Sequence, residues 1–356
     1  MYTFVPAIRH GQNEEKAFKK FYDELDGADE DLEAGVEDIK PLVEIVSDDD
    51  IENIGKYTRR FDEVFVDLPR YLTNRDNEHK ENIEDLLSEY SSDIVDFYID
   101  NQEIDFTPIV SGEIDPIDHS SYSQMIQGLK SEFDRICVRL FIPVDEFSSA
   151  QEREIENILE LLRENDAVIL DVVDIRELDR GIRPNIETIT EMTEDRDIYI
   201  FDLFEPRGEV NYNYGLVMTK HTEADGVGDF VIEPRFANYD DIPDVAFQNI
   251  PRRIHQYEHT DHTVTTKQDS DKYLQAVEEM LNQNILEPNH CPFCEALVDE
   301  YRTVKSDPDR KDLGAGFVKQ MRMNHYMYSV LANEFEDMAS AMDAEGFDED
   351  GFEDII

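Results

Sequence analysis

The chain has 356 residues, of which 40% are hydrophobic, so it can bury one large core or two ordinary ones. It contains no apolar run of about 18 residues, which excludes a membrane-spanning helix, and its first residues, MYTFVPAIRH, lack the pattern of a signal peptide. With 85 acidic and 33 basic residues it carries a formal charge of −52 and no basic cluster, which excludes a broad nucleic-acid-binding patch.

Short apolar segments alternate with amphipathic helices along residues 1–240. The strand candidates are 3–8, 39–46, 63–69, 105–112, 135–143, 166–175, 197–204 and 229–236. Eight such units predict an α/β fold, a (β/α)8 TIM-like barrel, because eight parallel strands close a barrel and about 250 residues is its usual length. A doubly wound open sheet is the alternative, but RHGQNE after the first strand is not the glycine-rich turn of a dinucleotide site.

The clearest of these units is a helix followed by the strand 166–175. Ser148 or Ser149 can cap the helix, and Glu152 follows Ser149 at the spacing of a capping box. The strand, DAVILDVVDI, is apolar on both faces, which predicts that it is buried on both sides. Asp171 interrupts it, and because an unpaired buried carboxylate is costly, we expect Asp171 to face a polar barrel mouth or a partner.

The chain changes character after the eighth strand candidate. Residues 254–268 alternate and are rich in threonine, which predicts a hairpin or an extra strand, and three amphipathic helices follow. We therefore expect a barrel over 1–240, a hairpin and helices packed on it over 241–340, and a disordered acidic tail over 341–356.

Acidic residues occur in every segment and are interleaved with the apolar periodicity, so an acidic tail does not account for the charge. A nucleic-acid mimic usually concentrates its charge on one face of a small protein. Adaptation to molar salt is favoured, because salt at 1 M screens charges beyond about 3 Å and an acidic surface keeps the chain hydrated. The composition resembles proteins of salt-in haloarchaea and their viruses, and the three cysteines suit a reducing cytoplasm.

Three segments, YTFVPAIRHGQNEEKAF, IKPLVEI and the strand ending in LDVVDI, together resemble the family named for the beta protein of T-even bacteriophages. The matching positions are Tyr2, Pro6, Arg9, Glu14 or Glu15, Pro41, Leu42 and Glu44. The resemblance covers about residues 1–330 and implies a virus or mobile-element context without an established activity. The position that is usually lysine in the family is Arg9 here or is lost, so no lysine chemistry is carried over.

Functional sites of (β/α)8 barrels lie at the C-terminal ends of the strands. That rule selects Arg9, His10, Glu44, Asp67, Arg70, Arg139, Asp171, Asp174, Asp202, Glu205, Glu233 and Arg235. The candidate catalytic residues, which could also hold a divalent cation, are Glu44, Asp171 and Asp202. The candidate substrate-binding residues, which could clamp a phosphate or carboxylate, are Arg9, Arg139 and Arg235.

This charge set predicts a hydrolase or lyase acting on an anionic, phosphate-bearing substrate. The simpler interpretation is that strand-end acids meet solvent or pair with arginine, although Glu44 and Asp171 stand out within apolar strands. The alternative function is a virus–host interaction or assembly scaffold, with the Met- and Tyr-rich helix 317–331 as its protein-binding surface. The sequence identifies no cofactor.

Two clusters of metal-binding residue types lie in the C-terminal region. Cys291 and Cys294 form a CPFC pair, for which half a zinc site with His290 or His325, a redox pair and an inert pair at a helix start are the alternatives. The inert pair is favoured, and no metal is assigned. A polar hairpin tip is likewise favoured over a metal site for His255, His259 and His262.

Overall fold

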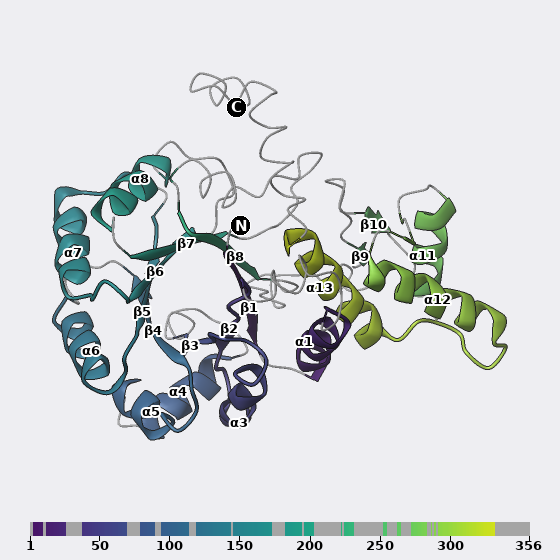
Figure 1. The fold of residues 1–356 in the computed structure, drawn as a ribbon, viewed down its shortest axis with the longest axis horizontal. Helices are drawn as coiled ribbons and strands as arrows, with labels where there is room; N and C mark the ends of the chain where they lie inside the picture. The colour runs from purple at the N-terminus through teal and green to yellow at the C-terminus, as the bar shows by residue number, and fades with distance from the viewer. Residues whose placement is uncertain are drawn as a thin grey trace, which may run out of the picture.

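The computed structural model describes residues 3–9, 12–25, 38–69, 79–89, 94–113, 119–143, 145–172, 182–193, 196–202, 222, 224–230, 252–254, 262–264, 272–282, 286, 288–289 and 291–331. Eight parallel strands form a closed barrel in sequence order, with β8 hydrogen-bonded back to β1 (Figure 1). The predicted (β/α)8 barrel with a C-terminal helical extension is confirmed. Among the described residues, no helix has the length and apolarity needed to cross a bilayer.

The barrel strands are β1 Thr3–Arg9, β2 Leu42–Glu44, β3 Phe65–Asp67, β4 Thr107–Glu113, β5 Cys137–Phe141, β6 Ala167–Val172, β7 Asp197–Asp202 and β8 Gly226–Phe230. The helices around them are α1 Gln12–Leu25, α3 Asp48–Tyr57, α4 Lys80–Glu89, α5 Ile94–Asp100, α6 His119–Glu132, α7 Ser149–Glu160 and α8 Ile182–Met192. The helices form a ring outside the sheet (Figure 1).

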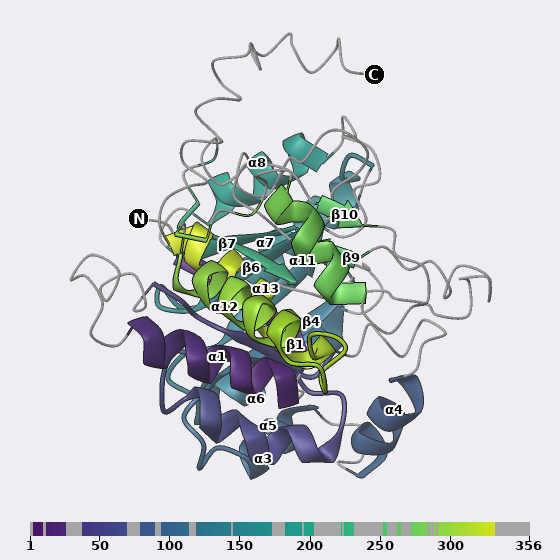
Figure 2. The same ribbon diagram turned by 90° about the vertical axis from the view of Figure 1, so that its right-hand side faces the viewer.

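The C-terminal extension comprises β9 Arg252–Ile254, β10 His262–Val264, α11 Lys272–Asn282, α12 Pro292–Ser306 and α13 Ala315–Leu331. The two strands pair antiparallel, in the region where the sequence predicts a hairpin. Helix α13 lies against α1 and β1, and α12 and α11 follow on its outer side (Figures 1 and 2). Helix α13, near the end of the described chain, therefore packs beside α1, the first helix.

The structure differs from the local predictions at three places. Helix α7 is capped by Ser148, one of the two predicted cap residues, but the capping box pairs Ser148 with Gln151 rather than Ser149 with Glu152, since the Ser148 hydroxyl accepts from the Gln151 N–H. Helix α3 was not predicted, although the Asp50 carboxylate accepts the N–H groups of Val46 and Ser47 at its start. Strand β8 begins at Gly226 rather than at residue 229.

A search for apolar runs misses the start of β8 because two of its first three residues, Gly226 and Gly228, are glycines. A Cβ added to Gly228 would lie 2.2 Å from the ring of Phe201 and 2.9 Å from the carbonyl oxygen of Val5. A side chain at Gly228 would therefore overlap the neighbouring aromatic ring, and only glycine permits this close approach. The large side chains of β7 thus fill the space that β8 leaves empty.

Two apolar clusters form the core. The larger lies between the outer face of the sheet and the helices, and it continues into α11, α12 and α13. The smaller fills the barrel and consists of Val5, Ala7, Leu42, Phe65, Ile109, Cys137, Ala167, Ile169, Tyr199 and Phe201. Where one strand contributes two of these residues, as β1, β6 and β7 do, they are two positions apart, as the pleat requires for side chains that share one face.

Tyr98 connects α5 to two strands of the sheet through its buried hydroxyl. The hydroxyl accepts the Leu68 N–H at 3.0 Å and lies within donating distance of the carbonyl oxygens of Ile109, at 2.8 Å, and Val66, at 3.1 Å. Burial raises the pKa of Tyr98 well above its usual value, so the hydroxyl keeps its proton for donation.

We expect Tyr98→Phe to lower the free energy of unfolding by about 1–3 kcal/mol, because the Leu68 N–H loses its buried acceptor. Urea unfolding in molar KCl measures the change. The control is Tyr22→Phe, at a half-buried ring that packs on Phe61, where we expect a change within about 0.5 kcal/mol. Equal effects of the two substitutions would contradict the role of the Tyr98 hydroxyl.

Candidate functional site

A cluster of charged side chains fills the C-terminal end of the barrel interior. At its centre is Arg139 of β5, a fully buried side chain. Its Nη1 donates to Glu44 Oε1 at 2.9 Å and to Asp67 Oδ2 at 2.7 Å, and its Nε donates to Asp171 Oδ2 at 2.6 Å. Strands β2, β3 and β6 each thereby contribute one carboxylate to a single guanidinium.

Two further polar side chains complete the cluster, which we call the Arg139 cluster: Arg9, Glu44, Asp67, Ser111, Arg139 and Asp171. Arg9 Nε donates to Glu44 Oε2 at 3.0 Å, and the Ser111 hydroxyl donates to Asp67 Oδ1 at 2.7 Å. The side chain of Arg9 is 14% exposed, whereas those of Glu44 and Arg139 are 0% exposed. Arg9 is therefore the member of the cluster that solvent reaches.

The register of the strands explains why these residues meet. On β5, Cys137 lies in the apolar interior layer and Arg139 is two residues further along, so both project inward. The same spacing relates Phe65 to Asp67 on β3 and Ile169 to Asp171 on β6. The charged residues thus lie one layer beyond the apolar filling, at the end where (β/α)8 barrels carry their sites.

Aromatic rings form the walls around the central guanidinium. The Cζ of Arg139 lies 5.1 Å from the ring centroid of Phe201 and 5.7 Å from that of Phe141. A cation close to aromatic rings is stabilised by their electron density, and the rings also exclude water. The charges of the Arg139 cluster therefore interact in an environment of low dielectric constant, where electrostatic interactions are stronger than in water.

Asp67 is a member of the Arg139 cluster whose pKa is shifted towards neutrality. The pKa of Asp67 is raised to about 6 by burial and by the negative charge of Glu44, while the Arg139 guanidinium and the Ser111 hydroxyl act against the rise. A carboxyl that titrates near pH 6 can both accept and release a proton close to neutrality. Asp67 is therefore suited to general acid–base chemistry.

The structure brings together four of the six predicted site residues: Arg9, Glu44, Arg139 and Asp171. Asp202 is the last residue of β7, in register with Val172 of β6, and its side chain lies outside the described residues. Arg235 also lies outside them, as do the other strand-end candidates His10, Arg70, Asp174, Glu205 and Glu233.

Two members of the Arg139 cluster, Asp67 and Ser111, were not among the six site residues predicted from the sequence. Asp67 satisfied the strand-end rule, and the signal that could have selected it is its position two residues after the inward-facing Phe65. Ser111 gave no such signal, because a serine near a strand end is common. Its role follows only from the pairing of β4 with β3, which brings its hydroxyl to Asp67.

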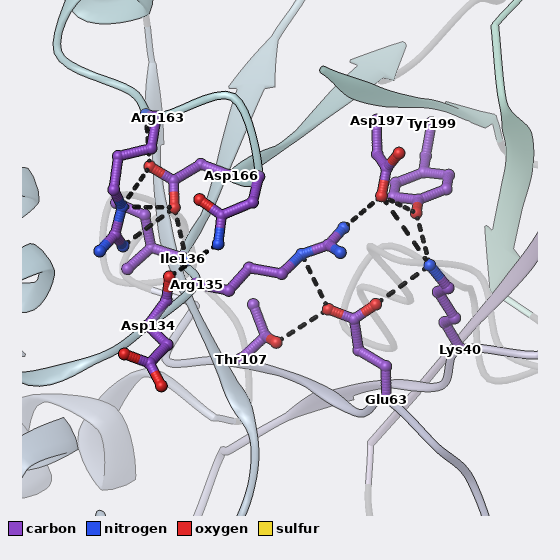
Figure 3. Close-up of polar contacts among 11 residues, drawn as sticks. Lys40, Glu63, Thr107, Asp134, Arg135, Ile136, Arg163, Asp166, Asp197 and Tyr199 are labelled. Carbon is purple, nitrogen blue, oxygen red and sulfur yellow. Dashed lines mark hydrogen bonds and ion pairs between the residues drawn. The ribbon is translucent and has the colours of Figure 1, made fainter. Parts of the chain in front are cut away.

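The opposite, N-terminal end of the barrel carries a second polar network (Figure 3). Glu63 forms ion pairs with Arg135 Nε at 3.0 Å and with Lys40 Nζ at 3.1 Å and accepts a hydrogen bond from the Thr107 hydroxyl at 2.9 Å, and Arg135 also binds Asp197 at 2.5 Å. These residues stand at or just before the starts of their strands. Charges at this end of a (β/α)8 barrel serve stability rather than catalysis.

The structure also places three residues of metal-binding types, two cysteines and a histidine, together in the C-terminal extension. The sulfurs of Cys291 and Cys294 lie 3.4 and 3.5 Å from Nδ1 of His325, and all three side chains are buried. The hydrogen bond from the side chain of Cys294 lowers the pKa of Cys291 to about 5, with His325 acting in the same direction and burial against it. The side chains of His290, His255, His259 and His262 lie outside the described set.

The chain was compared with families, curated proteins and solved structures. No protein-family model and no curated protein matches it. A chain of the tryptophan synthase complex from Pyrococcus furiosus is similar at 9% identity and a TM-score of 0.38, over 64% of this chain and 88% of the other. Dihydrodipicolinate synthase from Oceanobacillus iheyensis is similar at 10% identity and a TM-score of 0.25, over 94% and 97%. Likenesses this distant carry no information about substrate or reaction.

Proposed function

We propose that this protein is an enzyme of the hydrolase or lyase class that performs general acid–base chemistry at the C-terminal end of its barrel. The observation that carries the proposal is Asp67, a buried carboxyl with a pKa of about 6 between Arg139 and Ser111. A group that titrates near neutrality transfers protons efficiently in either direction. In this assignment Asp67 is the proton-transfer residue, and Arg139 and Ser111 are positioning residues.

The contacts of Arg139 and Arg9 indicate different roles for these two residues. Arg139 already donates to three carboxylates, so it orients the acids and balances their charge rather than clamping a substrate. Arg9 is partly exposed and is better placed to meet a phosphate or carboxylate group of a substrate. An anionic substrate is compatible with the cluster because protonation of Asp67 leaves two arginines and two carboxylates, with no net charge.

A divalent cation fits the Arg139 cluster poorly. Nη1 of Arg139 lies between the oxygens of Glu44 and Asp67, at 2.9 and 2.7 Å, where a shared metal ion would have to bind. Because the guanidinium already neutralises these carboxylates, proton transfer is favoured over metal chemistry for Glu44, Asp67 and Asp171.

The experiment is a ligand screen followed by turnover, both in molar KCl. Carboxylated and phosphorylated metabolites are screened by thermal shift, where a ligand at 100 times its dissociation constant adds about 2.7 kcal/mol to stability. Hits are then assayed for product formation. We expect Asp67→Asn to lose about 10²- to 10⁴-fold in rate, and the exposed-site control Asp299→Asn to retain wild-type turnover. Wild-type turnover by Asp67→Asn, or no shift with any compound in folded protein, would contradict the proposal.

The alternative function, an interaction or assembly scaffold, was suggested by the Met- and Tyr-rich helix 317–331, and the structure gives these residues another explanation. The Met-rich face of α13 is packed inside the protein, where Val318, Met321, Met323 and Met327 are buried, and Phe317 and Tyr328 are half-buried. No side chain of α13 whose burial the structure describes is exposed. These residues are accounted for as the core between α13, α1 and α12, so they do not indicate a surface for a protein partner.

A further inference from the structure

Three side chains of types that bind zinc and other soft metal ions meet between helices α12 and α13. Cys291 is the N-cap residue of α12, Cys294 lies in its first turn, and His325 comes from α13. Their ligating atoms all lie within 4.8 Å of one another. The exposed fractions of the three residues are 4%, 4% and 5%, so the group is enclosed by protein.

The distances within this group agree with those around a tetrahedral zinc ion. Zinc binds thiolate sulfur at about 2.3 Å and imidazole nitrogen at about 2.0–2.1 Å, which at the tetrahedral angle separates the sulfur from the nitrogen by about 3.5 Å. The separations are 3.4 Å from Cys291 and 3.5 Å from Cys294. The side chains are therefore already arranged for an ion to enter.

Hydrogen bonding alone accounts less well for this arrangement. Nδ1 of an imidazole offers either one proton or one lone pair, yet two sulfurs approach the same nitrogen at nearly equal distances. A metal ion satisfies both contacts at once. A redox-active pair is also disfavoured, because both cysteines are buried, whereas reactive cysteines are partly exposed.

The backbone at the start of α12 is arranged around the Cys291 sulfur. The Cys294 N–H donates to the Cys291 sulfur at 3.3 Å, which stabilises negative charge on that sulfur. The dipole of a 15-residue helix adds to this effect at its N-terminus. Pro292, at the first helical position, has no N–H that would need a partner there.

We propose that Cys291, Cys294 and His325 bind a zinc ion that joins α12 to α13 and holds both helices against the barrel. Phe293, between the two cysteines, connects the site to the barrel, since its ring stacks on Phe21 of α1 at 5.6 Å and 15°. The fourth coordination position is taken by water or by another side chain. The role of the ion is structural, because its ligands come from two helices outside the barrel interior.

The test measures metal directly and does not depend on catalysis. The full chain is purified under reducing conditions, stripped with chelator and reconstituted with zinc, and bound metal is determined by mass spectrometry. We expect about one zinc per wild-type chain, at least a tenfold loss of affinity in Cys291→Ser and in His325→Gln, and unchanged binding in Cys137→Ala. Cys137 is the matched control, a third buried cysteine that lies in the barrel interior.

Cobalt provides a second measurement that needs only the wild-type protein, should a variant fail to fold. Cobalt bound by two thiolates and an imidazole in a tetrahedral site gives intense visible absorption and sulfur-to-metal charge-transfer bands, and chelator should lower the melting temperature of the metal-loaded wild-type chain. Folded wild-type protein that binds neither zinc nor cobalt would overturn the proposal. Reversible formation of a Cys291–Cys294 disulfide without any metal binding would overturn it in favour of a redox pair.

Discussion

Replacing Arg139 with methionine is expected to lower the free energy of unfolding by about 3–5 kcal/mol. The substitution keeps an apolar side chain of similar length among Phe141, Phe201 and the strands, but it removes the cation that pairs with Asp67 and Asp171. Removing one partner of a buried ion pair leaves an uncompensated charge, which costs far more than the pair itself contributes. Urea unfolding at pH 7 in molar KCl measures the loss.

The control for this substitution is Arg302→Met in α12. Arg302 pairs with Asp299 at 3.0 Å, but the two side chains are 66% and 61% exposed. An exposed pair contributes about 0.2–1 kcal/mol at most, and less in concentrated salt. If both substitutions cost the same small amount, the Arg139 cluster would be hydrated and its charges would not be electrostatically coupled.

A second variant separates charge from packing. Combining Arg139→Met with Glu44→Gln, Asp67→Asn and Asp171→Asn removes the carboxylate charges that the guanidinium balances. We expect this combination to recover part of the stability lost by Arg139→Met alone, because neutral amides are less costly to bury than carboxylates. A further loss instead would show that the cluster is held together mainly by its hydrogen bonds.

The architecture could be predicted from the sequence because it depends on periodicity. The regular alternation of buried strands and amphipathic helices predicts a closed barrel, and the strand-end rule selects Glu44, Asp67, Arg139 and Asp171. Periodicity does not show which strand-end side chains point into the barrel and lie in the same layer of its interior. That depends on strand register, which brings Arg139 of β5 to Glu44 of β2 across the barrel.

Two further features depend on contacts between segments far apart in the chain. The pairing of Cys291 and Cys294 with His325 needs α13 to return beside α12, and nothing in the spacing of a CPFC motif specifies that return. The glycines at the start of β8 depend on neighbouring strands, since a side chain at Gly226 would overlap the backbone of Thr3 and one at Gly228 would overlap the ring of Phe201. Both are properties of tertiary packing, which local pattern does not encode.

The pH dependence of stability is expected to reveal the proton on Asp67. Because its folded-state pKa of about 6 exceeds the unfolded value of about 3.9, the folded protein binds the proton more tightly, and protonation favours folding. The contribution of Asp67 to stability is therefore fully present below about pH 4, and it falls as the pH rises towards about 6. Two pKa units correspond to about 3 kcal/mol in all.

The measurement compares wild type with Asp67→Asn, whose neutral side chain does not titrate, by urea unfolding between about pH 4 and pH 8 in molar KCl. The stability of wild type relative to the variant should decrease up to about pH 6 and remain constant above it. Asp299→Asn, at an exposed site, should follow the wild-type profile. A relative stability that is constant, or that rises with pH, would show that Asp67 is already ionised below this range, and it could not then be the proton-transfer residue.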